Sequence, residues 1–239
     1  MYDFKPMGDR GILISFEQKI SPDISSKIHL FTKKLDAEAN PAIVEIIPAY
    51  ATVCVVYEPM LMDYESVKNY LSGFLDDLND AGSISATVFE IPVLYNEETG
   101  PDMNFVSEHS GLSAGEIISI HTSREYLIYM LGFAPGFPYL GGMDERIAAP
   151  RLKVPRQKIT PGSVGIAGSQ TGMYSIESPG GWQLIGRTPV KLYDHERTPS
   201  VYYSAGDYIK YRAVDEDEFH HIQELVKNGT YEVISWQKS

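Results

Sequence analysis

Apolar residues recur at helical spacing in two stretches of the first eighty residues. The first stretch predicts a helix that begins after an N-cap at Ser21 and ends near Ala39, with four apolar residues on one face: Ile24, Ile28, Phe31 and Leu35. The second predicts a helix from Asp63 to Leu78 that ends near Gly82 and has three: Val67, Leu71 and Leu75.

Short runs rich in β-branched residues lie around these two helices. Gly11 to Phe16 reads as a strand, and Val44 to Pro48 and Thr52 to Tyr57 read as the two strands of a hairpin. A further strand is expected from Ile84 to Val93. This βαββα order predicts a small α+β domain with an open sheet, over residues 1–83.

The pattern changes after about residue 95. Short helical turns are expected at Pro101–Phe105 and Ser113–Ser119, followed by an apolar run from His121 to Met130. Residues 132–186 hold eleven of the twenty glycines and six of the fifteen prolines, a density that breaks helices and favours short strands joined by tight turns. The last part of the chain predicts strands at residues 201–204 and 208–211, then a helix from Asp215 to about residue 226 that ends at Asn228-Gly229. Residues 84–239 are therefore expected to form a β-rich barrel or sandwich.

Composition narrows the class of protein. The 239 residues are 43% hydrophobic and 22% charged, as in a globular protein with a sizeable core. A formal net charge of −12 argues against a nucleic-acid partner. No secretory signal or membrane span is expected, because the N-terminus lacks an apolar stretch after a basic start and charged residues interrupt the most apolar run. Since Cys54 is the single cysteine, we expect a cytoplasmic protein without an internal disulfide.

Several common catalytic motifs are absent. The chain has no P-loop motif, no H-E-x-x-H and no C-x-x-C. His121 and Glu125 could share a helix face, but two ligands do not make a metal site, and no metal is expected. Ser163 and Ser169 lie in glycine-rich loops without the G-x-S-x-G spacing of a nucleophile, so turn positions are favoured for both.

Positive charge gathers in one segment. Residues 146–191 hold seven basic residues and one acid, Glu177, and so carry a formal charge of +6. Glycines let backbone N–H groups approach an anion, and arginines bind carboxylate or phosphate with two parallel hydrogen bonds. A basic face that docks an acidic protein surface explains the same composition equally well. Both interpretations stay open from composition alone.

Two glycine- and proline-rich stretches stand out within or next to this segment. GFAPGFPYLGG, from residue 132 to 142, has no charged residue and suits a turn, a buried wedge or the wall of a site. SPGGWQLIGRTP, from residue 178 to 189, contains Trp182, which fits a structural role, and Arg187, which is harder to place in a core. A polar group framed by glycines at a strand end is common where a ligand meets the mouth of a barrel.

These two stretches, together with PGSVGIAGSQTGMY from residue 161, resemble the allophanate hydrolase subunit 1 / KipI family in order and spacing. PMGDR from residue 6 and PAY from residue 48 extend the resemblance over nearly the whole chain. The resemblance implies a small N-terminal α+β domain followed by a C-terminal cyclophilin-like β-barrel. It also implies that the protein acts as one subunit of a multi-subunit complex. Members include the B subunit of bacterial 5-oxoprolinase, which with the A and C subunits cleaves 5-oxo-L-proline to L-glutamate with hydrolysis of ATP.

The resemblance leaves the catalytic residues unassigned. Without a P-loop, any ATP site must be unconventional or shared with a partner. Our hypothesis is an anion-binding wall at the interface with the C subunit, and the candidates for substrate or nucleotide binding are His121, Arg156, Gln170, Thr171 and Arg187. The candidates for a partner interface or a rigid rim are Phe133, Pro135, Phe137, Tyr139 and Trp182. We also expect a cis peptide bond at Phe137-Pro138.

The family contains a second kind of function. KipI inhibits an autophosphorylating histidine kinase, so the alternative prediction is a regulator that binds such a kinase. Exposed rings of Phe133, Phe137 and Tyr139 would then serve as aromatic anchors.

Overall fold

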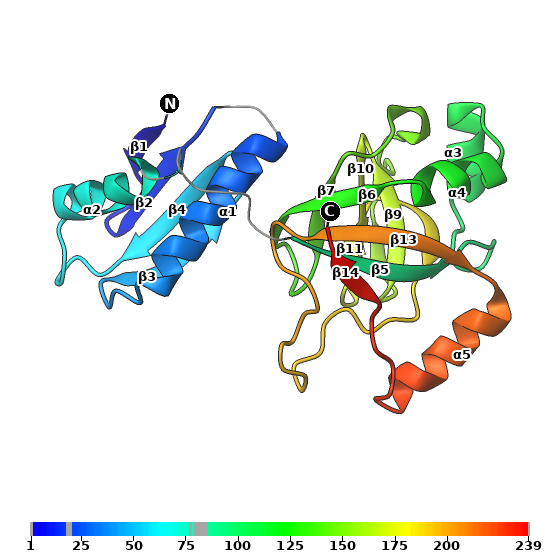
Figure 1. Ribbon diagram of the computed structural model, residues 1–239. Coiled ribbons are helices and arrows are strands. Elements are labelled where there is room, and N and C mark those ends of the chain that lie inside the picture. Colours follow the sequence, from blue (N-terminus) through cyan, green and yellow to red (C-terminus); the bar gives the residue numbers. More distant parts are fainter. Residues whose placement is uncertain (1, 18–20, 77, 79–85, 239) are drawn as a thin grey trace. The chain divides into compact units, whose positions relative to one another are not determined.

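The computed structural model describes residues 2–17, 21–76, 78 and 86–238. The contacts of the chain divide it into two units, residues 1–85 and 86–239, shown by their elements in Figure 1. Three predictions from the sequence lie outside the described residues: the boundary at residues 83 and 84, the start of a strand at Ile84 and the helix end near Gly82.

The first unit is a four-stranded antiparallel sheet with two helices. Its elements are β1 (Asp3–Pro6), β2 (Gly11–Ser15), α1 (Pro22–Ala37), β3 (Ile43–Pro48), β4 (Thr52–Tyr57) and α2 (Tyr64–Asp76), and the strand order is β1-β2-β4-β3. One buried cluster joins the predicted apolar faces of α1 and α2 to alternate residues of β2 and β4. The predicted N-cap is confirmed, because the Ser21 hydroxyl accepts a hydrogen bond from the Ile24 amide. The sequence pattern did not predict β1.

The second unit is built around a strongly curved sheet. Its strands are β5 (Thr87–Leu94), β6 (Glu125–Leu131), β7 (Pro138–Gly141), β9 (Ser163–Ala167), β10 (Gln170–Met173), β12 (Gln183–Arg187) and β13 (Tyr208–Val214), in the order β10-β9-β12-β5-β13-β6-β7. The two edge strands approach each other, since a Cβ atom added at Gly172 would lie 3.4 Å from the Pro138 carbonyl oxygen. The sheet is therefore nearly closed, which confirms an α+β fold with a β-barrel-like second part.

Three short strands complete the second unit. β8 (Arg156–Ile159) pairs with β11 (Ser178–Gly180) in a separate ribbon, and β14 (Ser235–Gln237) pairs with the beginning of β5. Figure 1 shows β14 alongside the strands of the barrel, near the C-terminus.

The helical segments of the second unit are longer than the expected turns. α3 (Met103–Ser110) and α4 (Ala114–Thr122) are full helices, and α4 is closed at its start by a capping box between Ser113 and Glu116. α5 (Glu216–Lys227) begins and ends as predicted: the Asp215 side chain caps it, and Gly229 follows at a φ of 70°. A 3₁₀ turn, η2 (Glu145–Ile147), lies between β7 and β8.

Two expectations about the backbone are wrong. Residues 201–204 do not form a strand: Val201 makes one isolated bridge with Tyr193, and the buried Tyr203 is held by its hydroxyl, which donates to the Gly136 carbonyl. Side-chain anchoring replaces strand pairing there. The Phe137-Pro138 bond is trans, and Pro138 begins β7 opposite Leu131; the cis bond among the described residues is Thr198-Pro199.

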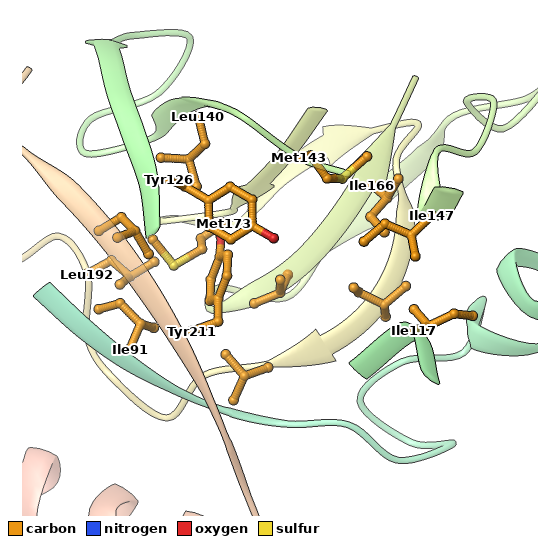
Figure 2. Close-up of a cluster of buried hydrophobic side chains, with 14 of the residues drawn as sticks. Ile91, Ile117, Tyr126, Leu140, Met143, Ile147, Ile166, Met173, Leu192 and Tyr211 are labelled. Atoms are coloured by element: carbon orange, nitrogen blue, oxygen red, sulfur yellow. The ribbon is translucent and has the colours of Figure 1, made fainter. Parts of the chain in front are cut away.

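The interior of the second unit is filled by side chains. Figure 2 shows Tyr126 and Tyr211 among aliphatic residues and methionines inside the curved sheet, including Ile91, Leu140 and Met173. All five are buried. The barrel is thus a packed core, and a ligand must bind at its surface or mouth.

Candidate binding site

Two of the predicted binding residues meet inside the barrel. His121, near the end of α4, is completely buried, and its Nε2 lies 2.8 Å from the hydroxyl oxygen of Thr171 on β10. Its Nδ1 lies 2.8 Å from the hydroxyl of Tyr95, and the ring of Tyr211 stacks on the imidazole at 4.4 Å. His121 and Thr171 therefore lie in the core.

The hydrogen bonds around His121 have one consistent direction. The Thr171 hydroxyl donates to the Gly165 carbonyl at 3.2 Å, which can only accept, so it accepts from His121 Nε2–H. His121 Nδ1 then accepts from the Tyr95 hydroxyl. Burial lowers the pKa of His121 to about 3 and raises the pKa of Tyr95 well above its ordinary value. This neutral hydrogen-bonded chain holds α4 against the barrel, and it uses both ring nitrogens of His121.

Arg156 is committed to an ion pair. Its Nη2 donates to Asp102 Oδ1 at 2.7 Å, while Asp102 Oδ2 accepts from the Leu184 amide at 2.6 Å. Asp102 precedes α3, and Leu184 lies on β12, so the pair fastens the start of α3 to the barrel wall. Arg156 thus acts within the fold. Gln170, the first residue of β10, is half-buried and lies next to the β9–β10 turn.

The aromatic stretch GFAPGFPYLGG divides into buried and exposed parts. Phe137 and Trp182 are buried in one small cluster, and Tyr139 packs against its edge. Phe133 and Pro135 are exposed; 64% of the Phe133 surface is open, and its φ of 65° is uncommon for a residue with a side chain. Because Phe137 is buried and Tyr139 is half-buried, the prediction of three exposed aromatic anchors is wrong, and Phe133 is the exposed ring of the three.

Arg187 lies at the mouth of the barrel, as its sequence context suggested. It is the last residue of β12 and pairs there with Leu94, the last residue of β5. Its guanidinium lies 5.6 Å from the centre of the Phe219 ring on α5. The arginine therefore projects between the end of the sheet and this helix.

A cavity of about 280 Å³ opens beside Arg187. It lies between α5, the turn before β9 and the segment after β12, and its polar or aromatic walls include Thr160, Arg187, Thr188, Lys191, Phe219 and Gln223. Gly162 shapes one wall: at its φ of 84°, an added Cβ would overlap the Thr188 carbonyl oxygen. None of His121, Arg156, Gln170 and Thr171 lines this cavity.

The basic segment is largely neutralised within the fold. Arg146, Lys158 and Lys191 have carboxylate partners within 3 Å, as does Arg156. Arg187 differs, because its ion pair with Glu98 is 3.5 Å long and its guanidinium makes no hydrogen bond to any described residue, although the side chain is only 26% exposed. Of the predicted anion-binding arginines, Arg187 is the one whose donors remain available.

Apart from Arg187, none of the wall residues named above was a candidate from the sequence, and two of them illustrate why. Phe219 and Gln223 are four residues apart and share one face of α5, which the helical period could have indicated. No local signal showed that this face would meet the end of β12, about thirty residues earlier in the chain.

Within the described residues, no group of three or more potential metal-binding side chains lies together. No helix in the same part of the chain has the length and apolar character needed to cross a membrane.

Comparison with known proteins identifies the family to which this chain belongs. The model of the family described as carboxyltransferase domain, subdomain C and D, matches residues 2–203, so the chain belongs to this family. A Bacillus subtilis protein, named as the B subunit of 5-oxoprolinase, is 40% identical over 233 residues, which cover 93% of this chain and 97% of the relative. The resemblance expected from the sequence motifs is therefore confirmed.

Comparison with solved structures finds the same fold in other proteins. A conserved uncharacterized protein from Pyrococcus horikoshii is 45% identical, with a TM-score of 0.54 over 91% of this chain and 100% of that one. The Kluyveromyces lactis urea carboxylase shares the fold with a TM-score of 0.79 at 18% identity; the match covers 99% of this chain and 24% of that one.

Proposed function

We propose that this chain is the B subunit of an ATP-dependent 5-oxoprolinase. The observation that carries the proposal is the 40% identity to the Bacillus subtilis B subunit over almost the full length of both proteins. In the reaction, the oxygen of water bonds to the lactam carbonyl carbon, the ring C–N bond breaks and the nitrogen takes up a proton. This gives L-glutamate, while ATP is hydrolysed to ADP and phosphate.

The chain works with partners in this proposal. The A and C subunits complete the enzyme, and the isolated chain has little or no activity. Since this sequence has no P-loop motif, the ATP site is either unconventional or shared with a partner. We place the complex in the cytoplasm.

The cavity beside Arg187 is the part of this chain that we propose to contact an anionic reactant. The partly buried guanidinium, the two hydroxyls of Thr160 and Thr188 and the amide of Gln223 offer donors around one small space. Such a site binds and orients a charged reactant, since an arginine keeps its charge at all physiological pH values.

Reconstitution tests the proposal. The chain is co-purified with the proposed A and C subunits, and glutamate release from 5-oxo-L-proline is followed with and without ATP. We expect release only with all three subunits and ATP. Arg187→Ala should lower kcat/KM at least tenfold, whereas the exposed Lys153→Ala control should not. A folded Arg187→Ala complex with unchanged activity would refute the role of the cavity, and an inactive wild-type complex would refute the function.

A further inference from the structure

We infer that the Arg187 cavity is selective for a small carboxylate and that Glu98 is a built-in competitor for the same guanidinium. The inference deepens the proposed function and rests on it for the choice of ligand, 5-oxo-L-proline. Glu98 lies in none of the sequence motifs and does not line the cavity, but its carboxylate pairs with the same guanidinium and would be displaced by the ligand.

The guanidinium of Arg187 has hydrogen-bond donors that the described part of the fold does not use. A guanidinium has five N–H donors, and a partly buried one that forms no hydrogen bond with its surroundings is poorly satisfied. The 3.5 Å separation from Glu98 is long for a charge-assisted hydrogen bond, whose usual range ends near 2.9 Å. Arg187 thus keeps the planar, two-donor edge that a carboxylate binds.

The backbone of Glu98 is fixed, whereas its side chain is free to move. Its turn is held in place: Thr99 donates to the Leu94 carbonyl at 2.7 Å, and the Thr99 amide donates to the Asn96 side chain at 2.8 Å. The Glu98 side chain itself is 82% exposed, and among the described residues it forms an ion pair with Arg187 and with no other. A carboxylate on a fixed backbone and a free side chain can approach Arg187 or swing into water at little cost.

The volume of the cavity limits the size of the ligand. Pockets for drug-sized ligands begin at roughly 300 Å³, so a cavity of about 280 Å³ suits a ligand smaller than a complete nucleotide. 5-Oxo-L-proline has one carboxylate for Arg187 and one planar lactam. The lactam N–H and C=O match groups that both donate and accept, which Gln223 and Thr160 supply at the cavity wall.

Binding to the full-length isolated chain tests this inference by calorimetry. The probes are 5-oxo-L-proline and its neutral analogue 5-oxo-L-prolinamide, and the key variants are Glu98→Gln and its neighbour Glu97→Gln. Both positions are exposed, but Glu97 makes no ion pair with a described residue, so the pair separates competition from a general change in charge.

We expect the acid to bind at least tenfold more tightly than the amide. Glu98→Gln should tighten acid binding about two- to fivefold, the range set by exposed ion pairs, with a smaller effect of Glu97→Gln and no effect of either on the amide. Arg187→Gln should weaken acid binding ten- to a hundredfold. Equal affinity for acid and amide, equal effects of the two glutamate variants, or no binding of the acid at millimolar concentration would each overturn the inference.

Failure here is distinguishable from failure of the proposed function. If the reconstituted complex releases glutamate but the isolated chain shows none of these effects, the inference alone is wrong. If the complex is inactive and the chain still binds the acid with the expected Glu98 effect, the carboxylate site stands and the proposed reaction is wrong. The glutamate variants lie on the surface, so the test survives if Arg187→Gln does not fold.

Discussion

The ion pair between Asp102 and Arg156 should act on stability and not on ligand binding. Asp102 is 12% exposed and accepts two short hydrogen bonds, from Arg156 Nη2 and from the Leu184 amide. Asp102→Ala removes both and leaves the Arg156 charge without its partner. Since a hydrogen bond to a charged group contributes about 1.5–3 kcal/mol, we expect a loss of about 3 kcal/mol in the free energy of unfolding.

Arg156→Met should cost less. The side chain of Arg156 is 29% exposed, and methionine keeps most of its apolar stem, while Asp102 retains the Leu184 amide. We expect a loss of about 1–2 kcal/mol. The double variant should be more stable than the sum of the single effects by about 1 kcal/mol, because the two residues interact directly.

Urea unfolding followed by tryptophan fluorescence measures these effects. Both tryptophans, Trp182 and Trp236, belong to the second unit, so the signal reports the barrel that contains the ion pair. The control is Lys153→Met, an exposed basic residue without an ion pair to a described residue. Affinity for 5-oxo-L-proline should change less than twofold in Arg156→Met. Unchanged stability combined with weaker ligand binding would refute this reasoning. It would indicate instead that Arg156 contributes to the anion-binding wall.

Three further predictions concern single residues. The folded state holds His121 neutral with a pKa of about 3, so the unfolded state binds more protons between pH 6.5 and 3; stability should fall as pH falls, by up to about 1.4 kcal/mol per pH unit. His121→Phe should show a shallower pH slope in urea unfolding between pH 7.5 and 5, with the exposed His220→Gln as control, and equal slopes would contradict the assignment. Gly162→Ala should destabilise by more than about 2 kcal/mol, because its Cβ would overlap the Thr188 carbonyl, while Gly168→Ala, also at positive φ but in open space, should cost about 1 kcal/mol; similar melting temperatures would show that the wall yields. Phe133→Asn should leave the melting temperature within about 2 °C of wild type, because asparagine tolerates the same φ, and reduced recovery of the partner subunits in co-purification would identify the ring as an interface residue.

The sequence pattern predicted the elements whose signals are local. The apolar face of α1, the cap at Ser21 and the cap at Asp215 depend on residues within a few positions of one another, and each is confirmed. β1 was missed because four residues with little burial carry no alternating pattern. The strand expected at residues 201–204 was wrong because its aromatic residues are anchored by side chains.

The candidate site was predictable only in part. Arg187 was found because glycines and a following proline frame it at a strand end. His121 and Arg156 were chosen for their chemistry, but their roles depend on distant partners: Thr171 is fifty residues from His121, and Asp102 is fifty-four from Arg156. Nothing in the local sequence distinguishes an arginine with a carboxylate partner from one without.

The pairing of β14 with β5 has a consequence for how this unit is joined to other polypeptide. Gln237 lies opposite Thr87, so the strand that opens the second unit and the strand that closes it are neighbours. The chain therefore enters and leaves this unit side by side, at Thr87 and Gln237. A polypeptide fused after β14 would leave beside the first strand and not across the barrel mouth that holds Arg187. Such a module can be inserted into a longer chain, or its ends relinked, without rerouting the fold.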